Sequence, residues 1–427
     1  MDGEGDWESG AVALLVDRKI LERKILATHL DSLGHLYSCV TSHYGFKKSR
    51  HEGKITGLAA YGEYSGAVEI LTQAIQIENG TIKLKYVKNN EKAKLLAILK
   101  RLGFVKKLYT SMDDIVNAAL NESPMYPDLA FAIQSVLEKS VCEIIEYWAK
   151  KWQVNSVALS GGIFANVKLN QKISELPSIN RVSIFPNMGD GGLSLGGVWW
   201  QLSQRNQLND GTLFDSMYLS NNLFEKSNLS LEFPGTTYSE LKQNELVNLI
   251  CDCIENGQVI GLHQNGVEFG PRALGNRSIL FDPRRQDLGK KLNSRLKRTE
   301  FMPFAPVILE KYFHDFMSTN NNSLQPFKYM TMTCTVKVEA RQKLTAVTHV
   351  DGTARPQLVN ANSNPLLFEI LTCFMSRTGI PALVNTSLNM HEEPINGYLE
   401  DSIQTLLRGG IDILVTKKGF YKVTGSV

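Results

Sequence analysis

The segment 268–280 combines the residue types and the backbone freedom expected of an anion-binding loop. Gly270 and Gly275 allow positive φ and a close approach of the backbone to a ligand. Arg272 and Arg277 carry planar guanidinium groups, which match the oxygens of a phosphate through paired hydrogen bonds. Taken alone, the residues also fit a glycine-rich loop followed by a basic helical turn. The segment therefore predicts an anion clamp that needs support from the rest of the chain.

Two more glycine-rich turns lie in the first half of the chain, each between a predicted strand and a predicted helix. The strands are expected at 154–159 and 181–185 and the helices at 165–173 and 193–201. Helix N-termini at the ends of neighbouring strands favour phosphate, and glycines let backbone amides face an anion. Such turns are also ordinary connections between strand and helix. The glycines concerned are Gly161, Gly162, Gly191 and Gly192.

Two aspartates stand beside these glycine-rich stretches. Asp2 precedes Gly3, and Asp190 lies between two glycines. Carboxylates that project into a cleft are suitable oxygen ligands for a metal ion. Aspartates also form turns with their own backbone, and two carboxylates alone make a weak metal site.

The elements that position these residues fall into two parts. With 427 residues the chain is long enough for two or three domains. The first part is expected to contain a hairpin, strands 11–16 and 20–28, and a second hairpin through Asn79-Gly80 into strand 81–87. Its helices are expected at 67–77, 90–101, 113–121 and, capped by Asp128, at 128–152.

A polar stretch at 203–237 predicts a linker, and a second domain follows it. Helices are expected at 240–255, 287–296, 365–377 and 399–408, and strands at 259–263, 330–338, 382–384, 413–416 and 420–423. This mixed order indicates α/β and α+β architecture.

Composition narrows the class of protein. The 46 basic and 43 acidic residues leave a formal charge of +3, which gives no reason to expect nucleic acid as a partner. The best apolar run near the start, 11–16, is too short to cross a bilayer, so no membrane partner is expected. The six cysteines include no CxxC pair and fit a cytoplasmic protein with reduced thiols. Cys251 and Cys253 fit the core better than a metal clip, because residues two apart on a helix face different ways.

Several ordered motifs resemble one family. After 268–280 come Lys297, Pro303-Phe304-Ala305-Pro306, the block 349–355, the block 385–389 and Glu393-Pro394-Ile395. Upstream, segments 32–37, 52–62 and 160–166 also match. Together they resemble the nodulation-type O-carbamoyltransferases (the NodU/CmcH/TobZ family) nearly from end to end.

The resemblance implies a fold and a reaction. Residues 1–202 would form an actin-like ATPase (ASKHA-type) domain that lacks its N-terminal part, 203–237 a linker, and 238–427 a YrdC-like domain. The second domain would form carbamoyl-adenylate from carbamoyl phosphate and ATP. The first would transfer the carbamoyl group to an acceptor hydroxyl on a sugar or secondary metabolite. ATP, a divalent metal (iron in the family) and Mg²⁺ are the implied cofactors.

The resemblance also assigns residues. The catalytic set is Arg272, Lys297, His349 and Arg355. The carbamoyl phosphate and ATP set is Gly270, Arg272, Arg277, Lys297, Asp351, Thr353, Arg355, Asn385, Thr386, Ser387 and Asn389. In the first domain, Gly161, Gly162, Asn166, Gly191 and Gly192 would bind the adenylate, Glu52 and Lys54 would line the acceptor pocket, and Asp2 and Asp190 would bind the metal.

The sequence departs from the family pattern in two places. No two histidines have the HxxxH spacing of the family's metal site, whose histidine segment should precede this chain, so a truncation, a homodimer, a partner chain or a remodelled site must account for it. Thr299-Glu300 and Met302-Pro303 replace the family's Arg-Glu and Arg-Pro. Without the missing part, an open sheet edge should make the chain associate, and transfer activity should be weak. A carbamoyl-adenylate-forming component of tRNA or hydrogenase maturation and a non-catalytic assembly subunit stay as alternatives.

Overall fold

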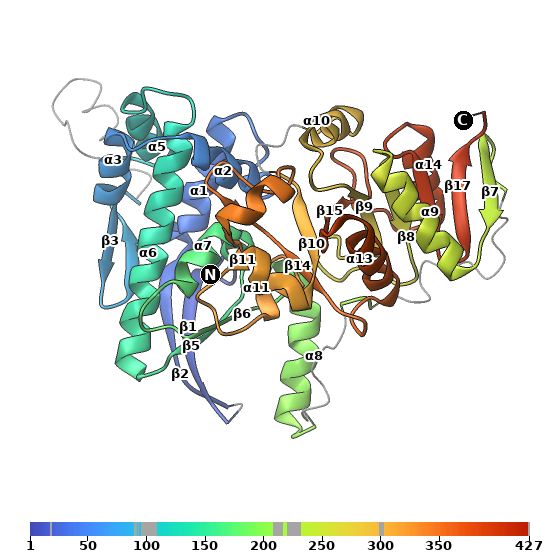
Figure 1. Cartoon of the computed structure of the whole chain (residues 1–427). Helices are drawn as coiled ribbons and strands as arrows, with labels where there is room; N and C mark the ends of the chain where they lie inside the picture. The colour runs from blue at the N-terminus through green and yellow to red at the C-terminus, as the bar shows by residue number, and fades with distance from the viewer. Residues whose placement is uncertain are drawn as a thin grey trace. The chain divides into compact units, whose positions relative to one another are not determined.

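The structure, a computed structural model of the whole chain, describes residues 1–17, 19–88, 92, 94, 109–207, 217–219, 232–298 and 303–425. The chain forms two compact units, shown in Figure 1: residues 1–207 with 320–323, and residues 208–319 with 324–427. The division at 207 falls inside the expected linker. The membership of 320–323 in the first unit has no signal in the sequence.

The first unit is built from small sheets and a long helix. Strands β1 (Glu8–Val16) and β2 (Lys19–Thr28) form the predicted antiparallel hairpin, and β3 (Ile75–Glu78) and β4 (Thr81–Leu84) form the hairpin predicted at Asn79-Gly80. Strands β5 (Ser156–Leu159) and β6 (Arg181–Ile184) pair in parallel. The helices are α1 (Leu33–His43), α2 (Glu52–Leu58), α3 (Gly66–Ala74), α5 (Met112–Asn121), α6 (Asp128–Trp152), α7 (Val167–Ser174) and α8 (Leu193–Gln204).

Helix α6 is the predicted amphipathic helix, and it buries apolar side chains along its whole length. The expected cap at Asp128 is wrong, because Pro127 holds the N-cap position. Asp128 instead accepts hydrogen bonds from the backbone N–H of Met125 at 2.9 Å and of Glu63 at 3.0 Å. The carboxylate therefore ties the preceding loops to the start of the helix.

Three further expectations in the first unit need correction or lie outside the described residues. The helix expected at 67–77 ends at Ala74, because Ile75 adopts an extended backbone and starts β3. The helix expected at 90–101 lies almost entirely outside the described residues. Strand β5, expected to be buried, leaves Ser156 and Ala158 exposed.

The second unit is organised around an eight-stranded mixed sheet with the order β14-β10-β15-β9-β8-β16-β17-β7. In chain order its strands are β7 (Thr236–Glu240), β8 (Ile260–His263), β9 (Arg277–Phe281), β10 (Ala305–Leu309), β14 (Gln357–Val359), β15 (Ala382–Ser387), β16 (Ile413–Thr416) and β17 (Gly419–Val423). A smaller sheet joins β11 (Met317–Ser318), β12 (Cys334–Val336) and β13 (Thr353–Ala354). The longer helices are α9 (Gln243–Glu255), α10 (Gln286–Arg295), α13 (Pro365–Thr378) and α14 (Leu399–Leu407).

The strand expected at 330–338 is mostly wrong, because only Cys334–Val336 is extended and Met330 has a φ of 56°. The helical turn considered for the end of the arginine segment is also wrong. Residues 277–281 form β9, whose five residues are all buried at the centre of the large sheet. The run Arg277-Ser278-Ile279-Leu280-Phe281 therefore serves as core.

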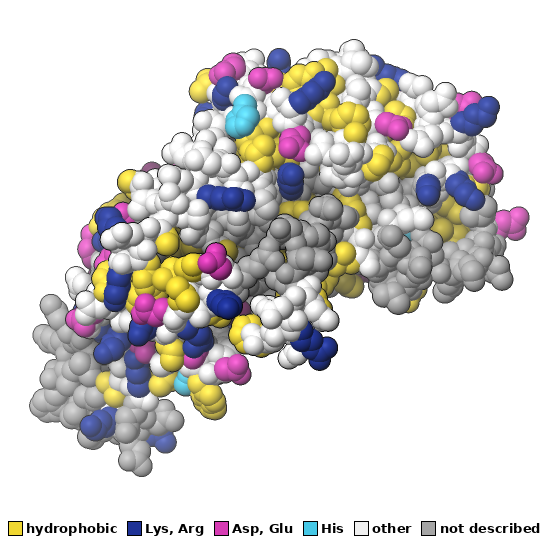
Figure 2. All heavy atoms as spheres, turned by 90° about the horizontal axis from the view of Figure 1, so that it is seen from below, with side chains coloured by type: hydrophobic (Ala, Val, Ile, Leu, Met, Phe, Trp, Pro, Cys, Tyr) yellow, Lys and Arg dark blue, Asp and Glu magenta, His cyan; other side chains and the backbone are white. Residues whose placement is uncertain are grey.

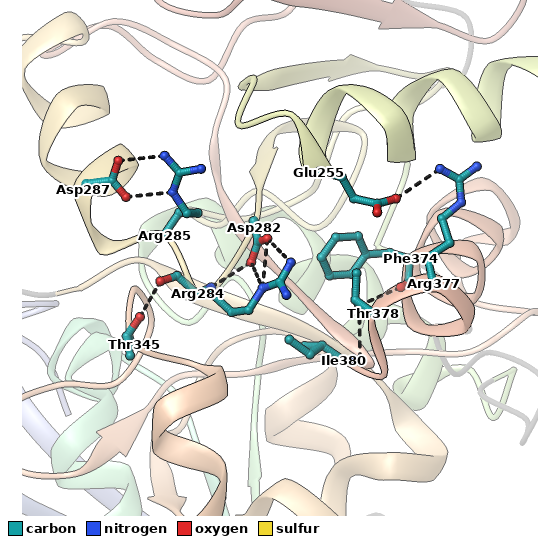
Figure 3. A network of polar contacts seen from close by, with 10 residues as sticks. All are labelled: Glu255, Asp282, Arg284, Arg285, Asp287, Thr345, Phe374, Arg377, Thr378 and Ile380. Atoms are coloured by element: carbon teal, nitrogen blue, oxygen red, sulfur yellow. Dashed lines mark hydrogen bonds and ion pairs between the residues drawn. The ribbon is translucent and has the colours of Figure 1, made fainter.

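The arginines that follow β9 are held by nearby carboxylates, as Figure 3 shows. Arg284 pairs with Asp282 at 2.5 Å, and Arg285 pairs with Asp287 at 2.9 Å. Asp282 is buried, so its charge needs this partner. The Asp282–Arg284 pair is therefore structural, whereas the Arg285–Asp287 pair lies on the surface.

Candidate functional site

Glu268 organises the glycine-rich arginine segment. One oxygen of its buried carboxylate accepts hydrogen bonds from the backbone N–H groups of Leu274 at 2.9 Å, Asn276 at 2.9 Å and Arg277 at 3.0 Å. Three donors that converge on one atom fix the path of the loop. Tyr218 adds support, since its hydroxyl donates to the carbonyl of Leu274 at 2.6 Å, and burial raises the pKa of Tyr218 and keeps this donor protonated.

Gly270 and Gly275 adopt positive φ, as predicted, with values of 147° and 114°. At Gly275 a side chain is excluded by space as well, because a Cβ would lie 2.6 Å from Cδ2 of Leu367. The loop therefore requires glycine for both backbone conformation and packing.

The two arginines of the segment have different surroundings. Arg277 is 2% exposed, and its guanidinium donates to the carbonyl oxygens of Gly397 at 2.9 Å, Asn276 at 3.1 Å and Gly266 at 3.3 Å, and also to that of Gln264. These contacts give Arg277 the role of joining three stretches of backbone. Arg272 is only half-buried, beside the exposed Pro271.

The end of β15 lies against this loop. The side-chain amide of Asn385 donates to Gln357 at 2.7 Å and to the carbonyl of Ala273 at 3.2 Å, and Gln357 donates to the carbonyl of Leu274 at 2.5 Å. Two residues later, Ser387 is opposite Ser278 on β9. The structure thus brings Asn385, Thr386 and Ser387 to the arginine segment.

Arg298 is a site residue that sequence reasoning missed. Its guanidinium donates to Oγ1 of Thr386 at 3.0 Å, to Oγ and the carbonyl oxygen of Ser387 at 3.1 and 2.9 Å, and to Oδ1 and the carbonyl oxygen of Asn389 at 3.0 and 2.9 Å. Lys297, the predicted residue, is exposed and has a φ of 58°. The left-handed turn at Lys297 follows α10, and the next residue contacts the end of β15. The only available signal was that Arg298 follows Lys297.

The block 349–355 forms a tight turn. The carboxylate oxygen Oδ1 of Asp351 accepts from Oγ1 of Thr353 at 2.6 Å and from its N–H at 3.0 Å, and it lies 3.5 Å from Nδ1 of His349. Gly352 has a φ of 78°. His349 is largely buried and Arg355 is half-buried. Gln357, which follows in β14, accepts a hydrogen bond from the side-chain amide of Asn385 and so links this region to β15.

In the first unit the two glycine turns lie next to each other. The N–H of Gly161 donates to the carbonyl of Met188 at 2.7 Å, and a Cβ on Gly161 would lie 2.0 Å from the carbonyl oxygen of Met1. Gly192 leaves similarly little room, with a Cβ at 2.2 Å from the carbonyl oxygen of Asn187, while Gly191 packs against the side chain of the same Asn187. Asn166 caps α7 by accepting from the N–H of Leu169 at 3.1 Å.

The aspartates predicted to bind a metal lie in or beside these turns. A Cβ on Gly162 would be 2.8 Å from Oδ1 of Asp2, and this oxygen accepts from the N–H of Gly3 at 2.7 Å. Asp190 starts the short helical turn Asp190–Gly192. Among the described residues no group of three or more His, Cys, Asp or Glu side chains is placed to hold a metal ion. The donors that the structure describes therefore do not fit the complete metal site implied by the resemblance.

Glu52 and Lys54, the residues predicted for the acceptor pocket, are held by local contacts on α2. The Glu52 carboxylate accepts from the N–H of Ser49 at 2.6 Å and from Oγ of Ser38 at 2.7 Å. The Lys54 side chain is buried, with Nζ 5.2 Å from the centre of the Phe46 ring. Their part in acceptor binding stays a prediction.

Two expectations about the whole chain can be compared with the described residues. All six cysteines are free, and Cys251 and Cys253 are buried on α9, which confirms the core interpretation. None of the helices in the described ranges is both long enough and apolar enough to span a bilayer.

The fold and the site define a mixed α/β protein with glycine-rich turns at strand ends in both units. The family model of the carbamoyltransferase N-terminus matches residues 1–198, and that of the carbamoyltransferase C-terminus matches residues 251–422. The chain belongs to the carbamoyltransferase family.

Individual relatives agree with this assignment. The nodulation protein NolNO of Sinorhizobium fredii is 31% identical over 97% of this chain and 59% of its own length. An uncharacterized protein of Methanocaldococcus jannaschii is 31% identical over 97% of this chain and 68% of its own length. The 3'-hydroxymethylcephem-O-carbamoyltransferase of Streptomyces clavuligerus is 29% identical over 63% of this chain and 49% of its own length. The chain thus spans less than two thirds of NolNO.

A solved structure of full-length HypF in the phosphate- and nucleotide-bound form also shares some similarity with this chain. The two are 14% identical, and the match covers 42% of this chain and 22% of that one with a TM-score of 0.30. This score is too low to define the fold.

Proposed function

We propose that this protein takes part in O-carbamoyl transfer and that its second unit forms carbamoyl-adenylate. In the proposed sequence water releases phosphate from carbamoyl phosphate, and the resulting carbamate attacks ATP to give carbamoyl-adenylate and pyrophosphate. An acceptor hydroxyl then takes the carbamoyl group and releases AMP. A relative named as a 3'-hydroxymethylcephem-O-carbamoyltransferase supports the hydroxyl acceptor.

The observation that carries this proposal is the convergence of three segments in the second unit. The loop fixed by Glu268, the end of β15 and Arg298 are joined by direct hydrogen bonds. The loop contains the half-buried Arg272, and Arg298 contacts the hydroxyl of Ser387 and the amide oxygen of Asn389. Cations and fixed polar donors of this kind suit substrates that carry phosphate groups, here carbamoyl phosphate and ATP.

The proposed roles follow from exposure and contacts. Arg272 and Lys297, which are accessible, neutralise phosphate charge as it moves between oxygens during the two displacements. Arg277 and Gly270 keep the loop in place around the ligand. Thr386 and Asn385, at the end of β15, orient the ligand. His349, Asp351, Thr353 and Arg355 form the second part of the carbamoyl phosphate site.

For the first unit we propose a nucleotide-facing role. In this proposal the adjacent turns with Gly161, Gly162, Gly191 and Gly192, and Asn166 at the start of α7, line the adenylate site. In fold terms, the proposal is an actin-like ATPase architecture for the first unit and a YrdC-like architecture for the second. We derive no step through a metal, since the described donors do not complete a site.

Exchange of radioactive pyrophosphate into ATP tests the proposal on the full chain. The proposal predicts exchange in the presence of Mg²⁺ that requires carbamoyl phosphate, because pyrophosphate can return to ATP only through the adenylate. A folded protein that shows no carbamoyl-phosphate-dependent exchange would contradict it. Equal exchange with and without carbamoyl phosphate would also count against it.

A further inference from the structure

Asn385 on β15 holds the arginine segment with only one half of its side-chain amide. The nitrogen Nδ2 donates to the carbonyl of Ala273 at 3.2 Å and to Oε1 of Gln357 at 2.7 Å. The carbonyl of Ala273 can only accept, which fixes the orientation of the amide. Among the side chains that the structure describes, Oδ1 of Asn385 is buried and has no hydrogen-bond partner. The strand thus contains one buried acceptor that the fold itself does not use.

The surroundings of Asn385 make an unpaired acceptor costly. Asn385 is 1% exposed, and its cross-strand neighbour Ala305 on β10 belongs to a buried apolar cluster with Met217, Leu274 and Met330. Side chains of cross-strand neighbours lie on the same face of a sheet. A buried acceptor without a donor loses the hydrogen bonds that water gives it in the unfolded chain. A ligand N–H group that reaches Oδ1 would recover this loss.

The proposed phosphate site lies on the same face of β15. Ser387 is two residues further along the strand than Asn385, and residues two apart in a strand share a face. Ser387 and Arg272 are half-buried, whereas Asn385 is closed off from solvent. Two strand residues span about 7 Å, which is comparable to the length of carbamoyl phosphate. A phosphate group held near Ser387 and Arg272 would therefore direct the rest of that molecule towards Asn385.

We propose that Oδ1 of Asn385 accepts a hydrogen bond from the amino group of the carbamoyl moiety and makes the second unit select carbamoyl phosphate over acetyl phosphate. This role rests on the proposed function of the second unit. Acetyl phosphate has a methyl group in the place of this amino group, with nearly the same shape and charge. A methyl group would leave the buried acceptor unpaired, and sites built to pair an N–H group reject analogues that lack it.

Charge on the protein surface cannot make this distinction. Both substrates are anions with the same phosphate group, so cations attract them equally. The Lys and Arg side chains on the face seen in Figure 2 are, moreover, spread among hydrophobic and acidic side chains. Selection must therefore depend on a contact with the end of the molecule that differs.

Pyrophosphate exchange with each acyl phosphate tests the proposal on the full chain. With acetyl phosphate, water would release phosphate, and the acetate would attack ATP to give acetyl-adenylate and pyrophosphate. We expect kcat/KM of the wild-type protein to be at least about a hundredfold higher for carbamoyl phosphate. A wild-type protein that exchanges equally well with both would overturn this role of Asn385 and leave the proposed function intact. No exchange with carbamoyl phosphate would remove both.

Two variants assign the selectivity to Oδ1. Asn385→Ala removes the acceptor and should lower the ratio of the two kcat/KM values at least about tenfold. Gln357→Ala is the matched control, because it removes one partner of the Asn385 amide and the hydrogen bond to the carbonyl of Leu274. It leaves Oδ1 in place, since the carbonyl of Ala273 still orients the amide. Activity with both substrates should fall by the same factor, and the ratio should stay within about threefold of wild type.

The ratio separates recognition from structure, because a loss of loop stability affects both substrates alike. An unchanged ratio in folded Asn385→Ala would overturn the proposal, as would a fall of the same size in Gln357→Ala. Adenine also carries an amino group on a planar ring, so ATP is compared with inosine triphosphate, which has an oxygen at that position. If Asn385→Ala changes the preference for ATP and keeps that for carbamoyl phosphate, Oδ1 belongs to the adenine site and the proposed role is wrong.

Discussion

At the scale of single residues, the two arginines of the glycine-rich segment have different roles. Arg277 is buried and bonds with backbone carbonyls from three stretches of chain. Arg272 lies two residues after Gly270 and is half-buried. A buried guanidinium whose donors are directed at carbonyls stabilises the loop, whereas a half-buried one can be reached by an anion. The proposed phosphate contact therefore rests chiefly on Arg272.

Substitution of Arg298 tests whether this residue positions the end of β15. In Arg298→Lys the charge remains, but the planar fork that reaches Thr386, Ser387 and Asn389 is lost. We expect kcat for pyrophosphate exchange to fall more than tenfold and the unfolding free energy to fall by about 1 to 2 kcal/mol.

Arg295→Lys is the matched control for Arg298→Lys. Arg295 lies three residues earlier and bonds with Asp412 at 2.8 Å, away from the end of β15. It should lose similar stability while kcat stays within about twofold of wild type. Equal losses of kcat in the two variants would assign Arg298 a purely structural role.

At the scale of elements, the sequence predicted those with strong periodicity or turn signals. Helix α6, the hairpin at Asn79-Gly80 and strand β16 are where the pattern placed them. Strand β9 was missed because its residues follow two glycines and an arginine and show no alternation, as expected of a central strand buried on both faces. The contact of Arg298 with β15 joins residues about ninety positions apart, which no local pattern reveals.

Gly275→Ala tests the loop that carries Arg272. The variant must adopt a φ near 114° and place a Cβ 2.6 Å from Cδ2 of Leu367. We expect a loss of at least about 2 kcal/mol in unfolding free energy, measured by urea titration. Gly379→Ala is the control, since Gly379 has a φ of 74° but no atom within 4 Å of a new Cβ, and should lose only about 1 kcal/mol. Equal losses would contradict the packing argument.

His263 at the end of β8 makes stability depend on pH. Burial, and secondarily the charge of Arg277, lowers the pKa of His263 from 6.5 to about 3. Between these values the unfolded chain binds a proton that the folded chain does not, so stability falls as pH decreases from 6.5 towards 3. The limiting slope is about 1.4 kcal/mol per pH unit.

Urea titrations at several pH values check this dependence. His263→Gln should reduce the slope between pH 6 and 4 by nearly one proton, whereas His314→Gln, at an exposed histidine, should not. An unchanged slope in His263→Gln would show that His263 takes up its proton equally in both states.

At the scale of the whole molecule, the chain crosses between its units more than once. Residues 320–323 belong to the first unit although the sequence around them belongs to the second. Asn321 accepts from the N–H of Val182 at 3.0 Å and donates to its carbonyl at 3.2 Å, so its side chain covers the outer edge of β6. The polar composition near 203–237 indicates one boundary, but nothing in the sequence marks this second crossing.

Asn321→Ala should destabilise the first unit selectively. The variant leaves the buried N–H of Val182 without its acceptor, which costs about 1 to 3 kcal/mol. Calorimetry should show a lower transition temperature for the first unit, while that of the second is unchanged. Asn322→Ala is the control, because Asn322 contacts Asn180 through its backbone N–H and its side chain is exposed. Equal transition temperatures of the first unit in Asn321→Ala and Asn322→Ala would show that the Asn321 side chain does not stabilise the edge of β6.

The most direct measurement for the central claim is carbamoyl-phosphate-dependent exchange of pyrophosphate into ATP by Arg272→Ala. The control is Arg285→Ala, which removes an arginine that Asp287 holds outside the proposed site. We predict that Arg272→Ala loses exchange by about a hundredfold or more while remaining folded by circular dichroism, and that Arg285→Ala retains it. Exchange within a few-fold of wild type in folded Arg272→Ala would contradict the assignment of this loop as the phosphate site.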